Sequence, residues 1–147
     1  MKTAYREIVK KWENEYDYDV YVFRDYYLTD FNNDGSADLL VKAGDSYAGT
    51  LTYVYTYKNG NILELGYAGG DETYCAYPGH NGIVKEGAHT GGNWVWLSTY
   101  KKGKIAFKQL ASKEVESYSD FFNIRARLKS HSRWKNGRYV PNYEDLK

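Results

Sequence analysis

The chain has few of the residues that form covalent or thiolate crosslinks. Among its 147 residues Cys75 is the only cysteine, so an internal disulfide and a cysteine-based zinc site are both excluded. It also lacks any apolar run near the roughly 20 residues that cross a bilayer, and no signal peptide follows Met1. We therefore expect a domain stabilised by its own core, without a transmembrane segment.

Charge of one sign is not in excess either. The formal net charge is +1, although acidic residues dominate positions 13–45 and basic residues dominate positions 101–138. This asymmetry is typical of two solvated faces, and the alternative is a basic patch for an anionic polymer such as a wall polymer or nucleic acid. No nucleic-acid-binding motif accompanies the basic half, so we expect no nucleic-acid partner.

Aromatic residues are abundant, and they favour strands. Aromatic side chains make up 18% of the chain, mostly as 17 tyrosines, and tyrosine fits the pleated surface of a sheet. Residues 50–57 alternate strictly and precede an Asn59-Gly60 turn, which predicts a hairpin that returns through residues 62–65. A second hairpin is predicted from residues 94–100 and 105–110. Regular hairpins of this kind indicate an antiparallel meander.

Helical periodicity is predicted at both ends of the chain. Apolar residues recur at three- and four-residue steps from Tyr5 to Tyr16, and again from Val115 to Leu128. Trp134–Tyr139 is typical of a tight turn, and Asn142 is a candidate cap for a last helical turn. We predict an α+β fold, an antiparallel β-meander sheet with an N-terminal amphipathic helix and a C-terminal helix packed on it. The predicted single domain, 1–147, comprises a helix at 1–17, a sheet at 18–111 and a C-terminal helical segment at 112–147.

One short stretch, residues 30–38, implies a specific chemistry. Oxygen-bearing side chains alternate at Asp30, Asn32 and Asp34, and a glycine follows. Ca²⁺ takes six to eight oxygen ligands, and a curled loop presents every second residue to the ion. An EF-hand is not indicated, because strands are predicted on both sides and Val41 stands where its bidentate glutamate would be. The predicted Ca²⁺ ligands are Asp30, Asn32, Asp34, Ser36 through its carbonyl, and Asp38; the alternative is an Asx-rich turn without metal.

Aromatic residues of the second hairpin are candidates for ligand binding. Trp94, Trp96 and Tyr100 fall on one face of their predicted strand. Such rings either pack in the core or, if exposed, stack on a sugar or contact a protein. The possible partners are therefore a surface glycan or a protein, and the sequence leaves the ligand and the oligomeric state open.

Catalysis is a further hypothesis. A small hydrolase would use Cys75 as nucleophile with His80 or His89 as base. No catalytic signature surrounds Cys75, and the sequence Tyr-Cys-Ala-Tyr is typical of a strand with a buried thiol. His80, Glu86 and His89 also do not match a zinc-ligand spacing. We therefore predict a non-catalytic domain.

The loop and two further segments resemble one kind of protein. Residues 27–41, 54–66 and 134–144 are similar, in the same order, to segments of small secreted or lipoprotein-type domains of gut Firmicutes. The loop alone also resembles those of FG-GAP repeats and dockerins, which occur in several copies, whereas this chain has one. The resemblance implies an extracellular or cell-surface domain in which calcium serves structure, and no enzymatic activity. An export signal or a lipid anchor would then lie outside this chain.

Overall fold

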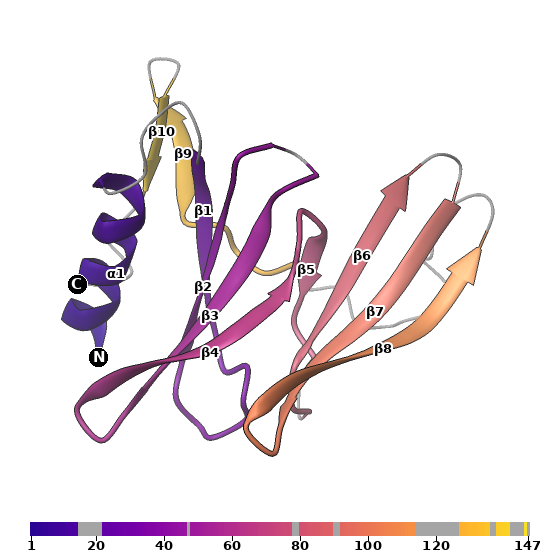
Figure 1. The fold of residues 1–147 in the computed structure, drawn as a ribbon, viewed down its shortest axis with the longest axis horizontal. Coiled ribbons are helices and arrows are strands. Elements are labelled where there is room, and N and C mark those ends of the chain that lie inside the picture. Colours follow the sequence, from indigo (N-terminus) through magenta and orange to yellow (C-terminus); the bar gives the residue numbers. More distant parts are fainter. Residues whose placement is uncertain are drawn as a thin grey trace.

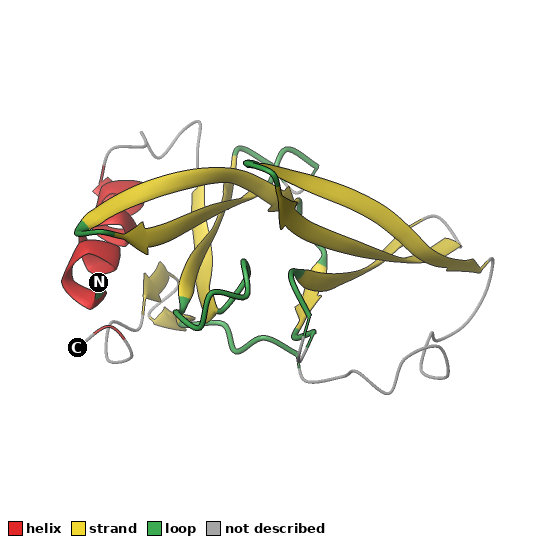
Figure 2. Cartoon of the chain, turned by 90° about the horizontal axis from the view of Figure 1, so that it is seen from below, coloured by secondary structure: helices red, strands yellow, loops and turns green. Residues whose placement is uncertain are grey.

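The structure is a computed structural model that describes residues 1–14, 22–46, 48–77, 80–89, 92–113, 127–135, 138–141 and 146. Two four-stranded antiparallel sheets lie side by side, with one helix at the outer side of the first sheet (Figure 1). Viewed from below, the helix lies at one end of the molecule and the second sheet at the other (Figure 2).

The helix α1 spans Lys2–Asn14. The first sheet has the order β1-β2-β3-β4, and the second has the order β5-β6-β7-β8. The strands are β1 Val22–Thr29, β2 Asp38–Gly44, β3 Leu51–Lys58, β4 Asn61–Gly69, β5 Thr73–Cys75, β6 Ile83–His89, β7 Gly92–Lys101, β8 Lys104–Lys113, β9 Ser132–Lys135 and β10 Arg138–Pro141.

The helix buries the apolar stripe that its sequence predicted. Tyr5, Val9 and Trp12 are buried against the first sheet, and Ile8 is partly buried beside them. Each fully buried side chain of this size contributes roughly 1.5–3 kcal/mol. The helix therefore forms because this stripe packs on the sheet, since isolated helices of this length are marginal in water.

A charged residue near the end of α1 predicts a pH dependence. Burial raises the pKa of Glu13 from 4.5 to about 7, while Lys10 opposes the rise. A raised pKa in the folded state means that the charged form is penalised, so the penalty is full above pH 7 and disappears as pH falls toward 4.5. We expect Glu13→Gln to be more stable than the parent by about 1–2 kcal/mol at pH 8, allowing for solvent screening, and equal to it near pH 4.5.

Urea unfolding of both proteins at the two pH values measures this difference. Glu7→Gln is the matched control, because the side chain of Glu7 is 63% exposed and pairs at the surface with Lys10. A Glu13→Gln advantage that is the same at both pH values would contradict the burial effect.

Strand alternation in the first sheet separates two cores. Leu39, Val41 and Ala43 of β2 belong to the cluster under α1, whereas Leu40 belongs to the cluster between the two sheets. Successive side chains of a strand point to opposite faces, so both faces of this sheet are covered. This explains why all seven residues of β2 are buried.

The prediction of one meander sheet is wrong, because the described strands form two four-stranded sheets and a separate β9–β10 pair. The first sheet ends at Gly69 of β4, and β5 pairs with β6 rather than with β4. The buried hydroxyl of Ser98 donates a hydrogen bond to the Ala68 carbonyl at 2.6 Å and so joins β7 to β4. The cluster between the sheets consists of Tyr27, Phe31, Leu40, Val54, Ala68, Tyr74 and Ile83.

The C-terminal helix is not seen in the part of the chain that the structure describes, so the predicted α+β fold holds only for the N-terminal helix and the antiparallel strands. Residues 114–126 and 142–145, which carry most of the predicted helical pattern, lie outside the described residues. The predicted tight turn near Trp134 corresponds to the antiparallel pair of β9 and β10, and Leu146 is buried in the cluster under α1. Among the described residues no helix is long and apolar enough to span a bilayer.

Candidate metal centre

The predicted calcium loop connects β1 to β2 on one edge of the first sheet. Thr29 and Asp38 form the last pair of the β1–β2 ladder, so residues 30–37 form a loop whose two ends are held together by paired strands. Phe31 is fully buried in the cluster between the sheets. The loop is therefore held by the paired strands at its two ends and by the Phe31 ring, which is buried in the cluster between the sheets.

The predicted ligand side chains are turned toward the loop's own backbone. The Asp34 amide donates to Asp30 Oδ1 and to Asn32 Oδ1, both at 3.0 Å. The Gly35 amide donates to Asp30 Oδ2 at 2.9 Å, and the Ser36 amide donates to Asp34 Oδ1 at 2.9 Å. Gly35 has a φ of 85°, which glycine adopts without a Cβ clash. The loop is thus already curled by its side chains.

Asp38 lies behind the loop rather than on its rim. Its side chain is fully buried, and Oδ2 accepts hydrogen bonds from the amides of Phe31 at 2.9 Å and Asn32 at 3.1 Å. Oδ1 is buried and has no partner with hydrogen-bond geometry in the described part of the chain. Burial raises the pKa of Asp38 to about 6, although the nearby Thr56 hydroxyl and the two amides oppose the rise.

Contacts from both neighbouring layers hold the loop. The Tyr5 hydroxyl of α1 donates to the Ala37 carbonyl at 2.9 Å. From the turn that leads into β6 of the second sheet, the Asn81 amide side chain donates to the Asn32 carbonyl at 3.0 Å, and the Gly82 amide donates to the Phe31 carbonyl at 2.8 Å. The loop therefore joins the helix, the first sheet and the second sheet at one point.

The donor set suits a hard cation. It contains three carboxylates, one side-chain amide and one backbone carbonyl, all of them oxygen donors. Each carboxylate oxygen of Asp30 and Asp34 accepts one hydrogen bond and keeps a second lone pair for a metal, whereas Asp38 Oδ2 already accepts two amides, so only its Oδ1 could serve. In the described residues no three carboxylate, histidine or cysteine side chains converge on one point, so a metal would need the amide and carbonyl oxygens as well.

The aromatic candidates on β7 are only partly accessible. Trp94, Trp96 and Tyr100 are each of intermediate exposure, and Tyr100 packs against the cluster between the sheets. The indole of Trp94 lies over Gly87, its cross-strand partner, where a Cβ would collide with the ring. Each of the three rings is therefore partly packed against the protein and partly exposed to solvent.

The candidate catalytic residues occupy different settings. Cys75 is 1% exposed in β5, whereas His80 is exposed and stacks on the Tyr77 ring at 4.2 Å between centroids. Glu86 lies in β6 opposite Thr73 and Val95. The side chain of His89 lies outside the described residues.

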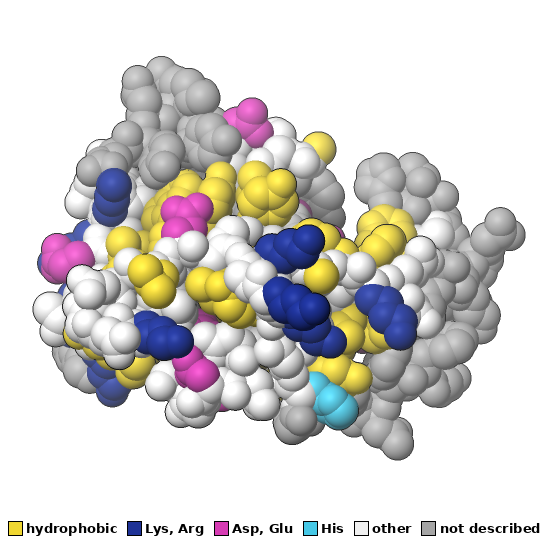
Figure 3. All heavy atoms as spheres, turned by 60° about the horizontal axis from the view of Figure 1, so that its bottom comes forward, with side chains coloured by type: hydrophobic (Ala, Val, Ile, Leu, Met, Phe, Trp, Pro, Cys, Tyr) yellow, Lys and Arg dark blue, Asp and Glu magenta, His cyan; other side chains and the backbone are white. Residues whose placement is uncertain are grey.

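The predicted basic half of the chain is visible on β8 and its turn. Lys101, Lys102, Lys104 and Lys108 are exposed, and Figure 3 shows lysine and arginine side chains gathered over this part of the surface. Lys101 and Lys104 are direct cross-strand partners, an arrangement of like charges that is mildly destabilising.

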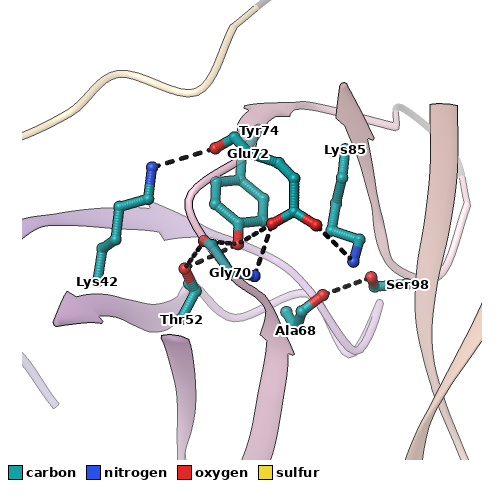
Figure 4. Close-up of polar contacts among 8 residues, drawn as sticks. All are labelled: Lys42, Thr52, Ala68, Gly70, Glu72, Tyr74, Lys85 and Ser98. Carbon is teal, nitrogen blue, oxygen red and sulfur yellow. Dashed lines mark hydrogen bonds and ion pairs between the residues drawn. The ribbon is translucent and has the colours of Figure 1, made fainter. Parts of the chain in front are cut away.

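A buried polar cluster that the sequence patterns did not predict lies between the two sheets (Figure 4). Lys42 of β2 pairs with Asp71 at 3.2 Å, and Lys85 of β6 pairs with Glu72 at 3.3 Å. The Lys42 ammonium also donates to the Glu72 carbonyl at 3.1 Å. Two lysines, one from each sheet, therefore hold the short connection between β4 and β5.

Tyr74 completes this cluster. Its hydroxyl lies 2.8 Å from the Thr52 hydroxyl and 2.7 Å from the Gly70 carbonyl. Burial, together with the Glu72 charge, raises the pKa of Tyr74, so the phenol stays protonated and can donate. The Gly70 amide donates to Glu72 Oε2 at 2.6 Å. A signal for this cluster was present in the sequence, since Lys42 stands among the apolar residues of Leu39–Ala43.

Comparison with protein-family models, curated proteins and solved structures finds no match to this chain. The resemblance to secreted lipoprotein-type domains therefore stays a prediction.

Proposed function

We propose that this chain is a non-catalytic calcium-binding domain in which calcium stabilises the fold, and that it acts as an interaction module on the outside of a cell. Asp30, Asn32, Asp34 and the Ser36 carbonyl would hold the ion, with Asp38 behind them. The ion supplies positive charge among the carboxylates, and the side chains orient the loop.

The observation that supports this most is the burial of Asp38. A buried carboxylate is costly unless it is paired or hydrogen-bonded at both oxygens. Oδ2 of Asp38 has two amide donors, whereas Oδ1 meets no donor with full hydrogen-bond geometry in the described residues, although the Thr56 hydroxyl lies near the carboxylate. A cation beside this loop would offset the burial of that charge.

The same ligand set favours a location outside the cell. It lacks the bidentate glutamate that tightens EF-hand sites, and extracellular calcium modules typically bind with dissociation constants of about 10⁻⁴–10⁻³ M. A loop that bound calcium in that range would fill only where calcium is abundant. This supports an exported or surface-anchored protein.

Calcium is expected to raise the thermal midpoint, and Asp34→Ala to abolish the rise. At a concentration 100 times the dissociation constant, calcium stabilises by about 2.7 kcal/mol, which corresponds to roughly 5–10 °C for a domain of this size. Asp34 is exposed, so its replacement removes a ligand without opening the core. Differential scanning calorimetry with calcium and with chelator measures the shift.

Glu7→Ala is the matched control, because it removes one exposed carboxylate far from the loop in sequence. It should keep the full response to calcium. If the midpoint of the parent protein is the same with calcium and with chelator, the loop is an Asx-rich turn that needs no metal.

A further inference from the structure

A groove lies beside α1 on the first sheet. The helix backbone packs closest to β1 and β2, which leaves part of this sheet face beside β3 and β4 open. The groove has a volume of about 530 Å³, within the range of about 300–1,000 Å³ that is typical of ligand sites. It is lined by Ile8, Lys11, Trp12, Tyr53, Tyr55, Ile62 and Glu64.

Aromatic rings in this groove are held in fixed positions. The Trp12 indole donates to the Tyr55 hydroxyl at 3.1 Å, which joins the helix wall to the floor. The rings of Trp12 and Tyr53 are tilted at 39° with centroids 4.5 Å apart. Trp12 and Tyr55 are each only 7% exposed, so they form the base of the groove, and the partly buried Tyr53 ring is the one on which a ligand could stack. Because Trp12 already orients the Tyr53 ring, such stacking would cost little further side-chain entropy.

Charged groups of both signs line the same groove. Lys11 and Glu64 are both exposed. The ammonium of Lys11 can only donate hydrogen bonds, and the carboxylate of Glu64 can only accept them. A ligand with net charge would gain at one of these groups and be repelled at the other. The pair therefore favours a neutral ligand that both accepts and donates hydrogen bonds.

We propose that this groove binds a neutral oligosaccharide. A sugar ring would offer its C–H face to the partly exposed Tyr53 ring and its hydroxyl groups to Lys11 and Glu64. Figure 3 shows hydrophobic side chains at the surface over the β3–β4 part of the molecule, with an acidic side chain among them. The inference names a ligand class for the proposed interaction role but does not depend on calcium binding.

Isothermal titration calorimetry with cellohexaose and with chitohexaose tests the inference, in the presence of a chelator so that the loop plays no part. We expect at least one of the two saccharides to bind. Tyr53→Ala should raise its dissociation constant about tenfold or more, which corresponds to about 1.4 kcal/mol of binding free energy. Glu64→Gln keeps the shape of an exposed side chain and should weaken binding about threefold or more, so the result does not depend on one variant's stability.

Trp96→Ala is the matched control, because Trp96 lies on β7 of the second sheet and does not line the groove. It should bind the saccharide as the parent does. Binding that is lost in Trp96→Ala and kept in both groove variants would overturn the assignment of the site. Binding of neither saccharide at millimolar concentration, or of a proline-rich peptide alone, would overturn the ligand class.

Discussion

Lys42→Met is expected to destabilise the protein by about 3–5 kcal/mol at neutral pH. Lys42 is 7% exposed, and its ammonium pairs with Asp71 and donates to the Glu72 carbonyl. Methionine keeps the length of the side chain and removes the charge, so Asp71, whose side chain is 19% exposed, loses its cation in a largely buried place. Chemical denaturation at pH 7 measures the loss.

Lys10→Met is the matched control, since Lys10 pairs with Glu7 at the same 3.2 Å but is 46% exposed. Its replacement should change stability by no more than about 0.5 kcal/mol. Equal losses in the two variants would show that burial does not decide the effect. Adding Asp71→Asn to Lys42→Met should restore part of the stability, because the stranded charge is then removed.

The Lys42 variant should also respond to acid differently from the parent. Burial raises the pKa of Asp25, and Lys42 opposes that rise. Without Lys42 the pKa of Asp25 moves further up, so the charged form costs more at neutral pH and is relieved as pH falls. The deficit of Lys42→Met should therefore shrink on going from pH 7 to pH 5.

Gly82→Ala is expected to cost about 2–5 kcal/mol, through backbone strain together with overpacking. Gly82 has a φ of 103°, and a Cβ there would collide with the Ser98 carbonyl of β7. Its amide also donates to the Phe31 carbonyl at the base of the loop. The substitution should therefore displace residue 82 from β7 and weaken its hydrogen bond to the Phe31 carbonyl of the loop.

Gly103→Ala isolates the contribution of the backbone angle. Gly103 has a φ of 80°, but a Cβ at this position meets nothing within 4 Å. We expect Gly103→Ala to cost about 1 kcal/mol, and thermal melts of both variants provide the comparison. If Gly82→Ala costs no more than Gly103→Ala, the close approach to Ser98 does not limit the fold.

Local patterns in the sequence predicted the strands well and their pairing less well. The alternation at residues 50–57 appears as β3, and the Asn59-Gly60 turn joins it to β4. Which strand lies beside β5 was not predictable in this way. Pairing depends on contacts between distant residues, and the regular spacing of the two predicted hairpins had indicated one continuous meander.

The loop shows the same division. Its alternating oxygens and its glycine were evident from residue types alone, and the structure places them in a curled connection between β1 and β2. That Asp38 is buried behind the loop, and that Asn81 reaches it from the second sheet, depended on residues far apart in the chain.

By itself the sequence determined the N-terminal helix, the two long hairpins and an oxygen-rich loop between strands, because each rests on the spacing of neighbouring residues. The tertiary structure alone decided that strands β1–β8 divide into two sheets, that Lys42 and Lys85 meet Asp71 and Glu72 between them, and that a groove remains beside α1. The physical reason is that burial and charge pairing are properties of surfaces brought together by folding. A local pattern fixes which face a side chain occupies but not what covers that face.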